Sequence, residues 1–333
     1  MITELLLQSI EKQFKSAMTF DVKRCLRSRY NKAECDLCLS VCNQNALILD
    51  GRKISFSSEK CSDCLACVSV CPNDAFACSF DLAAVLSTLQ DNKQSSPIVL
   101  TCKESGRHAN QLLIPCIGLL SEPVLAAMHS VSDRHFFLDV HHCAGCENHA
   151  TLDILQKNIQ RISAKMKDRT SLNIQLLTAK NHPPSDLNAE RRALLRQTTT
   201  SLFEMGKEAS TRLFSPCDTK TDIEEKGKHA SRTSRLLQEA LKISRHKMIE
   251  GKNLLYSYHY TVTTNSNCDC CPACTGMCPS GALNRLLVQG KKQLLFTSAH
   301  CSGCGLCVSF CQKKALSLNS GAHHDGHVVL ATT

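Results

Sequence analysis

Eight cysteines near the end of the 333-residue sequence have the spacing of metal ligands. They form two runs with the same gaps: Cys268-x2-Cys271-x2-Cys274-x3-Cys278 and Cys301-x2-Cys304-x2-Cys307-x3-Cys311. In each run three thiols share one tight loop, and the fourth is far enough along the chain to reach a neighbouring site. Together they form a complete thiolate set for two cubane iron–sulfur clusters. A zinc site or a disulfide framework fits this double run less well.

The same pattern occurs near the N-terminus, so the sequence contains an internal repeat. One run there is intact and follows a shorter one: Cys61-x2-Cys64-x2-Cys67-x3-Cys71 and Cys35-x2-Cys38-x3-Cys42. Lys32 stands where the first cysteine of the shorter run would fall. Cys25 is the nearest upstream thiol, and the basic segment 27–32 can loop back to present it, so we expect Cys25 to be the displaced ligand. The alternative is an ordinary buried thiol beside a three-cysteine cluster.

Both regions resemble bacterial-type dicluster ferredoxins, over roughly residues 25–80 and 265–320. The resemblance implies four 4Fe-4S clusters with these ligand sets: Cys25, Cys35, Cys38 and Cys71; Cys42, Cys61, Cys64 and Cys67; Cys268, Cys271, Cys274 and Cys311; Cys278, Cys301, Cys304 and Cys307. Asn43 and Gln312 depart from the family, which often has Pro after the fourth cysteine. The extra thiol Cys270 can compete with Cys268, although the spacing favours Cys268.

A further group of cysteines lies between these regions. Short apolar runs at 97–100, 112–114, 136–140 and 172–177 alternate with helical patterns at 121–131 and 149–167. This alternation predicts a small parallel sheet covered by helices. Cysteines follow three successive strands: Cys102, Cys116, and the pair Cys143 and Cys146. Because the carboxyl ends of parallel strands meet at one edge, we expect these four thiols to converge there.

These four thiols, together with Gly118, weakly resemble the iron–sulfur delta subunit of methyl-viologen-reducing hydrogenases. The resemblance implies a 2Fe-2S cluster and electron passage toward heterodisulfide reductase; the closer cysteine pairing of that family around the first ligand is absent. A structural zinc ion and an unliganded or redox-active Cys143–Cys146 pair remain open alternatives. Three histidines flank the site; they are alternative ligands that can replace a thiolate, although we expect them to be solvated: His141, His142 and His149.

The elements that position these sites make up a predicted α+β fold, with two cluster modules flanking the α/β domain and a helical connector. The expected segments are an amphipathic N-terminal helix at 1–24, a module at 25–82, the α/β domain at 95–179, the connector at 180–255, a module at 256–320 and a tail at 321–333. We expect the N-terminal helix to pack on the adjacent module or dock on a partner. The connector is expected to be a solvated bridge, or else a surface for an acidic redox partner. His323, His324 and His327 are assigned to a solvated tail.

Composition narrows the function classes. The 43% hydrophobic content suits two or three small units rather than one large core. The first residues show no secretory or twin-arginine signal, and the longest apolar run, at 112–120, is too short to cross a bilayer. We therefore expect a cytoplasmic chain without a transmembrane segment, in which 23 cysteines mostly hold metal. The formal charge of +9 is offset by roughly −8 on four bound cubanes, so it does not predict a nucleic-acid partner.

Electron transfer between redox protein partners is the function that these residues favour. The sequence contains no nucleotide-binding glycine loop, flavin fingerprint or Ser-His-Asp arrangement, so we expect no catalytic residues of its own. One alternative is an electron-feeding subunit of a hydrogenase or a heterodisulfide-reductase-like oxidoreductase, and another is a redox sensor. Four cubanes and the middle site use all but three cysteines: Cys78, Cys217 and Cys270.

Overall fold

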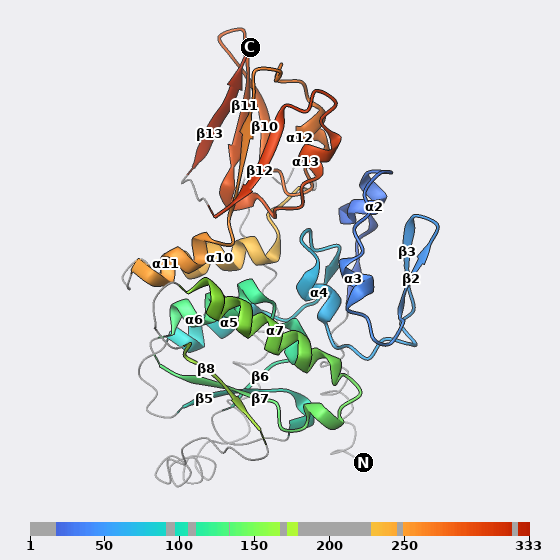
Figure 1. Ribbon diagram of the computed structural model, residues 1–333, viewed down its shortest axis with the longest axis vertical. Helices are drawn as coiled ribbons and strands as arrows, with labels where there is room; N and C mark the ends of the chain where they lie inside the picture. Colours follow the sequence, from blue (N-terminus) through green and yellow to red (C-terminus); the bar gives the residue numbers. More distant parts are fainter. Residues whose placement is uncertain are drawn as a thin grey trace, which may run out of the picture.

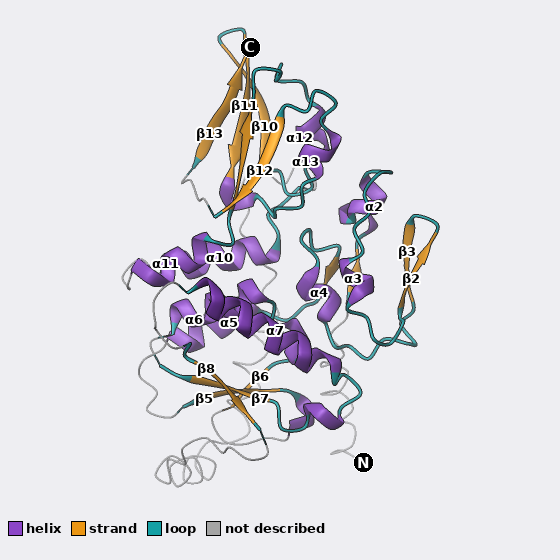
Figure 2. Cartoon of the chain, in the orientation of Figure 1, coloured by secondary structure: helices purple, strands orange, loops and turns teal. Residues whose placement is uncertain are grey.

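The computed structural model describes residues 18–90, 97–105, 111–132, 134–166, 172–178, 228–244, 249–321 and 326–333. Within these ranges the chain contains both helices and β-sheets, as the predicted mixed class requires. Figures 1 and 2 show a sheet with helices stacked on it, the second cluster module beyond those helices and the first module beside them. No helix in the described ranges is both long and apolar enough to cross a bilayer.

The sheet has four parallel strands in the order β6-β5-β7-β8. They are β5 (Ile98–Thr101), β6 (Gln111–Leu113), β7 (Phe136–Asp139) and β8 (Ile174–Leu177), each within two residues of an apolar run in the sequence. Every residue of β5 and β7 is buried, which is typical of central strands in a parallel sheet. Because side chains alternate along a strand, Leu100 and Phe136 join the main core, whereas Val99 and Phe137 form a small separate cluster.

Three helices lie on one side of the sheet in Figure 1: α5 (Leu82–Gln90), α6 (Glu122–Val131) and α7 (Ala150–Lys165). Helix α6 follows Ser121 and has Glu122 and Pro123 in its first turn, residue types that favour a helix start. Residues 124–128 are all buried. A helix that is apolar on all sides needs neighbours on all sides, and α6 packs against α5, α7 and two later helices, α10 (Arg232–Ile243) and α11 (Ile249–Tyr256).

Helix α10 corrects the prediction of a solvated connector, as far as that segment is described. Residues 180–227, including Cys217, lie outside the described residues. Leu236, Leu237 and Ala240 of α10 are buried in the main core, because the apolar stripe of the helix faces α5 and α6. Gln238 Nε2 also donates to Ala299 O at 2.5 Å, so α10 joins the sheet unit to the second module.

The first module consists of short elements between its cysteines. They are β1 (Thr19–Phe20), η1 (Val22–Arg24), α2 (Leu26–Arg29), α3 (Leu37–Ser40), β2 (Leu47–Asp50), β3 (Lys53–Phe56), α4 (Ala66–Val70) and β4 (Phe76–Ala77). Strand β1 pairs antiparallel with β4, and β2 with β3. Leu47, Ile54 and Leu65 belong to the same apolar core as the parallel sheet. The first module and the sheet unit are therefore one packed body rather than two small units.

The predicted N-terminal helix at 1–24 is wrong where the structure describes it. Residues 1–17 lie outside the described ranges, and the residues that follow form β1 and the 3₁₀ turn η1. Phe20 pairs with Phe76 across the strands and stacks on it, with ring centroids 4.5 Å apart. This long-range pairing overrides the local helical periodicity.

The second module repeats this plan and adds one strand. Strand β9 (Tyr260–Thr264) pairs with β12 (Leu316–Ser320), β10 (Leu283–Val288) forms a hairpin with β11 (Lys291–Thr297), and the cysteine loops carry η7 (Ser298–His300), α12 (Ala273–Met277) and α13 (Leu306–Phe310). The predicted solvated tail is wrong for residues 327–332, which form β13 (His327–Thr332) on the free edge of β11. Leu330 and Ala331 pack on the core of this module, and His327 Nδ1 lies 2.6 Å from Thr297 Oγ1. His323 and His324 lie outside the described residues.

Candidate iron–sulfur sites

A single backbone turn recurs after the last cysteine of each run. Its third residue after the cysteine has a positive φ, of 51°, 51°, 70° and 48°, and its fourth is a buried alanine: Asn45 and Ala46, Asp74 and Ala75, Gly281 and Ala282, Lys314 and Ala315. In two copies the alanine N–H points back at the thiol, from Ala75 to Cys71 Sγ at 3.2 Å and from Ala315 to Cys311 Sγ at 3.4 Å. An N–H donor favours the thiolate form of cysteine, which is the form that binds metal.

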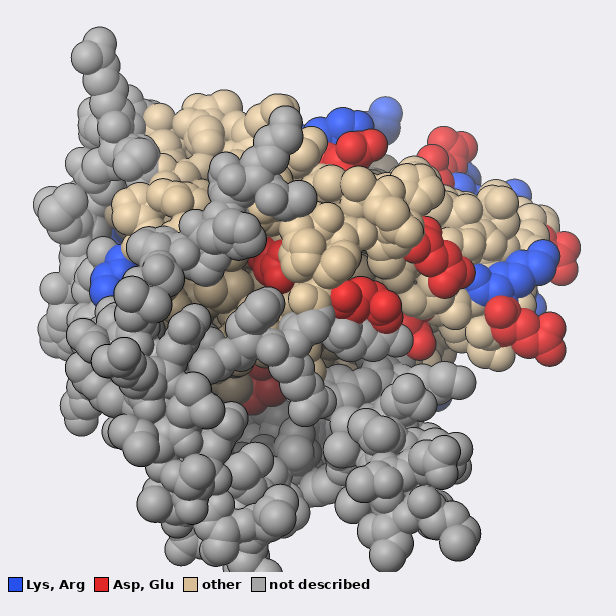
Figure 3. All heavy atoms as spheres, turned by 90° about the horizontal axis from the view of Figure 1, so that it is seen from below, with Lys and Arg blue, Asp and Glu red and all other residues tan. Residues whose placement is uncertain are grey.

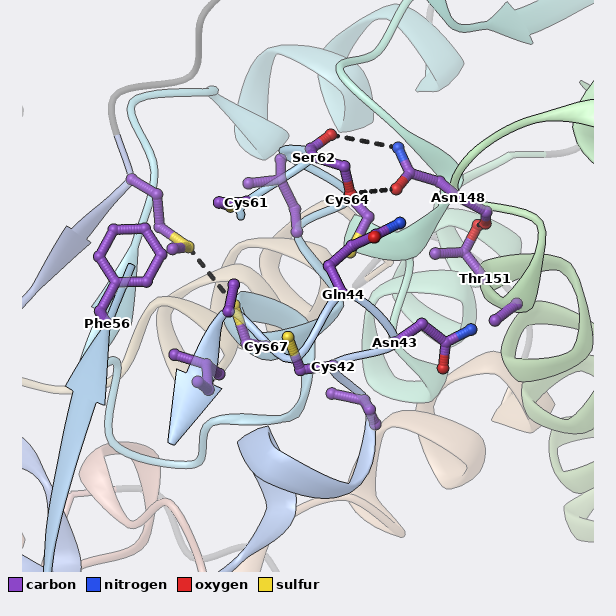
Figure 4. Close-up of a pocket in the computed structure, with 16 residues that line it drawn as sticks. Cys42, Asn43, Gln44, Phe56, Cys61, Ser62, Cys64, Cys67, Asn148 and Thr151 are labelled. Atoms are coloured by element: carbon purple, nitrogen blue, oxygen red, sulfur yellow. Dashed lines mark hydrogen bonds between the residues drawn. The ribbon is translucent and has the colours of Figure 1, made fainter. Parts of the chain in front are cut away.

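Four thiols of the first module surround one pocket: Cys42, Cys61, Cys64 and Cys67. The pocket measures about 500 Å³ including its open mouth, and its other walls are largely apolar, from Met18, Val41, Phe56 and Leu65 (Figure 4). Burial raises the pKa of Cys61, Cys64 and Cys67. The protein alone therefore disfavours the thiolates, and a bound cation is what would stabilise four of them together.

The other four predicted ligands of this module also lie together. Burial raises the pKa of Cys38 to about 12, and the thiols that add to this rise are Cys71, Cys35 and Cys25. Cys25 immediately precedes α2, and Arg27 of that helix donates through Nε to Cys35 O at 2.5 Å and through Nη2 to Glu34 O at 3.1 Å. The basic segment thus folds back and brings Cys25 beside the shorter run. Cys78 is engaged elsewhere, since its Sγ accepts from Arg232 Nη1 at 2.9 Å.

The second module has a matching pocket of about 320 Å³, lined by Cys278, Cys301, Cys304 and Cys307. Burial raises the pKa of Cys301 to about 12 and also raises the pKa of Cys304 and Cys307. The four-thiol sets and their apolar walls fit the cubane clusters that the cysteine spacing predicts.

Three of the remaining thiols of this module lie close together. Burial raises the pKa of Cys274 to about 11, with Cys271 and Cys268 as its thiol neighbours. Lys313, two residues after Cys311, forms an ion pair with Asp269, with Nζ 2.7 Å from Oδ2. This pair brings the turn that follows Cys311 next to Cys268. Cys270 is only 1% exposed and has a φ of 54°. It occupies the same loop position as Gly303, which also has a positive φ, in the following run. Its side chain packs in the core of the module beside Cys268.

The four thiols of the middle group converge at the carboxyl edge of the parallel sheet. Burial raises the pKa of Cys143 to about 12, and the neighbouring groups that add to this rise are the thiols of Cys102, Cys116 and Cys146 and the carboxylate of Asp139. His141 Nδ1 lies 2.6 Å from the buried Asp139 carboxylate, and His149 Nδ1 lies 3.3 Å from Cys146 O; His142 is exposed. In the described part of the chain, no three Cys, His, Asp or Glu side chains are grouped as ligands of a single metal ion.

The middle group lies against the first pocket. Burial raises the pKa of Cys116 to about 11, and Cys64 of the pocket is among the thiols that add to the rise. Asn148 Nδ2 donates to Ser62 O at 3.2 Å (Figure 4). Gln44 Nε2 donates to Glu147 O, also at 3.2 Å. Gly118 approaches so closely that an added Cβ would lie 2.2 Å from Cys64 O, so this contact requires glycine.

The two modules also touch directly. Arg29 donates through Nε to Met277 O and through Nη2 to Gly276 O, each at 3.2 Å. Tyr30 lies edge-on to Phe310, with ring centroids 5.3 Å apart. Ser302 Oγ donates to Asn73 Oδ1 at 2.8 Å. The sequence pattern did not identify Asn73, Ser302 or Gly118 as contact residues, although the repeated Cys-x3-Ala turn that holds Asn73 is visible in it.

Comparison with known proteins identifies part of this chain. Residues 32–75 match the family described as a 4Fe-4S dicluster domain. No curated protein and no solved structure matches. The match covers the cysteines from Cys35 to Cys71, and it supports 4Fe-4S clusters and an iron–sulfur electron-transfer role.

Proposed function

We propose that this protein is a multi-cluster electron carrier that relays electrons between redox protein partners. Four 4Fe-4S clusters would be held by the four ligand sets given above, with Cys25 completing the first. When bound, each cubane supplies a one-electron redox centre. The protein's own residues hold the thiolates, exclude water with apolar walls and keep the sites in contact.

The observation that carries this proposal is the continuity of the sites. Cys116 of the middle group interacts with Cys64 of the first pocket. Cys67 of that pocket interacts with Cys38 of the neighbouring set. Asn73, which follows Cys71 of that set, contacts the Cys301–Cys304 loop of the second module. A continuous series of redox sites is what an electron relay requires.

The middle group at the start of this series and the Cys268 loop of the second module both approach the surface. Ala144 and Gly145 in the middle loop are exposed, and so is Asp269 beside Cys268. Two separate exposed ends favour passage between two partners, one at each end. On the described part of the face in Figure 3, acidic and basic side chains are intermixed, unlike the single-sign stripe of a nucleic-acid-binding surface.

We assign the middle group to a 2Fe-2S cluster at the end of the series, with a structural zinc ion as the alternative. Its likeness to a hydrogenase delta subunit favours a second proposal, that the chain feeds electrons to an oxidoreductase. Anaerobic co-purification of a flavin or molybdenum subunit would support that assignment, and purification of the chain alone would support a free carrier.

Iron, sulfide and zinc analysis of the anaerobically purified chain tests the cluster content. Four cubanes give about 16 iron atoms per chain, and a 2Fe-2S cluster raises the value to about 18. About 16 iron atoms with one zinc identify the middle group as a zinc site. About 8 iron atoms per chain would contradict the proposal that both modules hold clusters.

A further inference from the structure

Asn73 lies buried at the contact between the two modules. It is 1% exposed and belongs to the turn after Cys71 of the first module. Its side-chain oxygen is satisfied by the second module, because Ser302 Oγ donates to Oδ1 at 2.8 Å. The residues joined by this hydrogen bond are 229 positions apart in the sequence. One side chain of the first module therefore reaches into a cysteine loop of the second.

The other half of the Asn73 amide has no hydrogen-bond partner in the described part of the chain. Among the described residues, Nδ2 is buried without a hydrogen-bond acceptor, an arrangement that costs about 1–3 kcal/mol if nothing satisfies it. Ser302, which donates to the oxygen of this amide, stands two residues before Cys304, so the amide lies against the loop that carries the Cys304 thiol. Burial raises the pKa of Cys304, and the Asn73 side chain opposes that rise. A neutral thiol is a weak acceptor. A metal-bound thiolate at Cys304 is a charged acceptor and would take the free N–H.

The surrounding residues hold Asn73 in this position. The buried Arg24 donates through Nε to Asn73 O at 2.5 Å, and its Nη2 lies 4.0 Å from Asp74 Oδ2. Asp74 Oδ2 in turn accepts from the backbone N–H of Arg232, at the start of α10, at 2.5 Å. The turn is thus fixed by the first module and by α10 together. Asn73 has little freedom to turn its amide away from Cys304.

We propose that Asn73 couples the two modules by donating a hydrogen bond from Nδ2 to the Cys304 thiolate, which raises the reduction potential of the cluster held by Cys278, Cys301, Cys304 and Cys307. This inference rests on the proposed function. Reduction of that cluster by a reduced cubane of the first module moves one electron, and no proton moves and no bond forms or breaks. The added negative charge is shared by the cluster sulfurs, so an N–H donor stabilises the reduced form more than the oxidised form. Asn73 is a positioning residue that favours electron flow toward the second module.

Redox titration of the anaerobic full-length protein, followed by electron paramagnetic resonance, tests this proposal with two variants. Asn73→Ala removes the amide, and Asn73→Asp keeps an oxygen for Ser302 but removes the donor. In both, one cluster should become harder to reduce, with its reduced-to-oxidised ratio at a fixed potential falling about tenfold, which is about 59 mV for one electron. The other clusters should keep their potentials.

Gln44→Ala is the matched control, because Gln44 occupies the same turn position after Cys42 but donates to Glu147 O. It should leave the potential of the second-module cluster unchanged. If no potential changes in Asn73→Asp while its iron content is normal, or if Gln44→Ala produces the same shift, the proposal is wrong. If Asn73→Ala loses iron, Asn73→Asp decides. Unmutated protein lacking clusters would instead contradict the proposed function, so the two failures are distinguishable.

Discussion

Replacing Gly118 by alanine tests how closely the middle group fits the first module. A Cβ at this position would lie 2.2 Å from Cys64 O and 2.8 Å from Thr151 Cγ2. Ordinary contact begins at 3.4 Å, so the Cys64 carbonyl has to retreat by about 1 Å. That carbonyl belongs to the backbone of the loop that holds Cys61, Cys64 and Cys67, and cannot rotate away as a flexible side chain can.

The expected cost follows from the size of this clash. Forcing one extra carbon into a well-packed interior typically lowers the free energy of unfolding by about 1–3 kcal/mol. In a body of about 150–250 residues, each kcal/mol lowers Tm by about 2–4 °C. Because the displaced loop carries three candidate ligands of one cubane, the iron content should also fall, by up to about four atoms per chain.

Thermal denaturation under anaerobic conditions, followed by circular dichroism, measures the first effect, and iron analysis measures the second. Gly145→Ala is the control, because a Cβ there meets no atom within 4 Å and its φ is not positive. It should change the free energy of unfolding by less than about 0.5 kcal/mol. If Gly118→Ala matches Gly145→Ala in both Tm and iron content, the close approach of the middle group to Cys64 is refuted.

Three further predictions address single sites. Cys25→Ser should convert one cubane to a three-iron form, seen as a 3Fe-4S signal in electron paramagnetic resonance, or lose that cubane. Cys78→Ser is the control and should keep all the cubane signals, because the Cys78 thiol accepts a hydrogen bond from Arg232. Four intact cubanes in Cys25→Ser would show that another group completes the set. Replacing Cys143 and Cys146 together by serine should abolish one spectroscopic species and slow electron transfer to a partner. The clusters of the second module should remain, because that module has its own core. Unchanged spectra and an unchanged rate of electron transfer would show that the sheet unit is only a structural spacer. Burial lowers the pKa of His129, whose Nδ1 lies 2.6 Å from Asn173 Oδ1, so the unfolded chain binds a proton near pH 6.5 that the folded chain does not. The free energy of unfolding should therefore fall as the pH drops from about 7.5 to about 5.5, and an equally steep fall in His129→Gln would contradict this assignment.

Local sequence predicts the cysteine loops and the strands well, because their patterns extend over a few residues. The runs that become β5 and β7, and the helices α6 and α7, lie close to where periodicity puts them. The convergence of Cys102, Cys116 and Cys143 follows from parallel strand topology alone. These features need no knowledge of distant partners.

Features that depend on distant partners could not be predicted in this way. The apolar stripe of α10 identifies a helix but not the α5 and α6 surface that buries it. Residues expected to form the end of a helix are strand β1, because they pair with β4, and residues expected to form a tail are strand β13, because they pair with β11. The contact of Asn73 with Ser302 joins positions 229 residues apart, and no pattern in either segment indicates the other.

The four turns after Cys42, Cys71, Cys278 and Cys311 keep the shape of the loop separate from its contacts. Their backbone is set by the third and fourth residues after the cysteine. The side chain two residues after the cysteine makes a different contact in each turn: Gln44 with Glu147, Asn73 with Ser302, Ser280 with Cys278, and Lys313 with Asp269. A substitution at this second position therefore changes the neighbour of one site and leaves the shape of its loop unchanged.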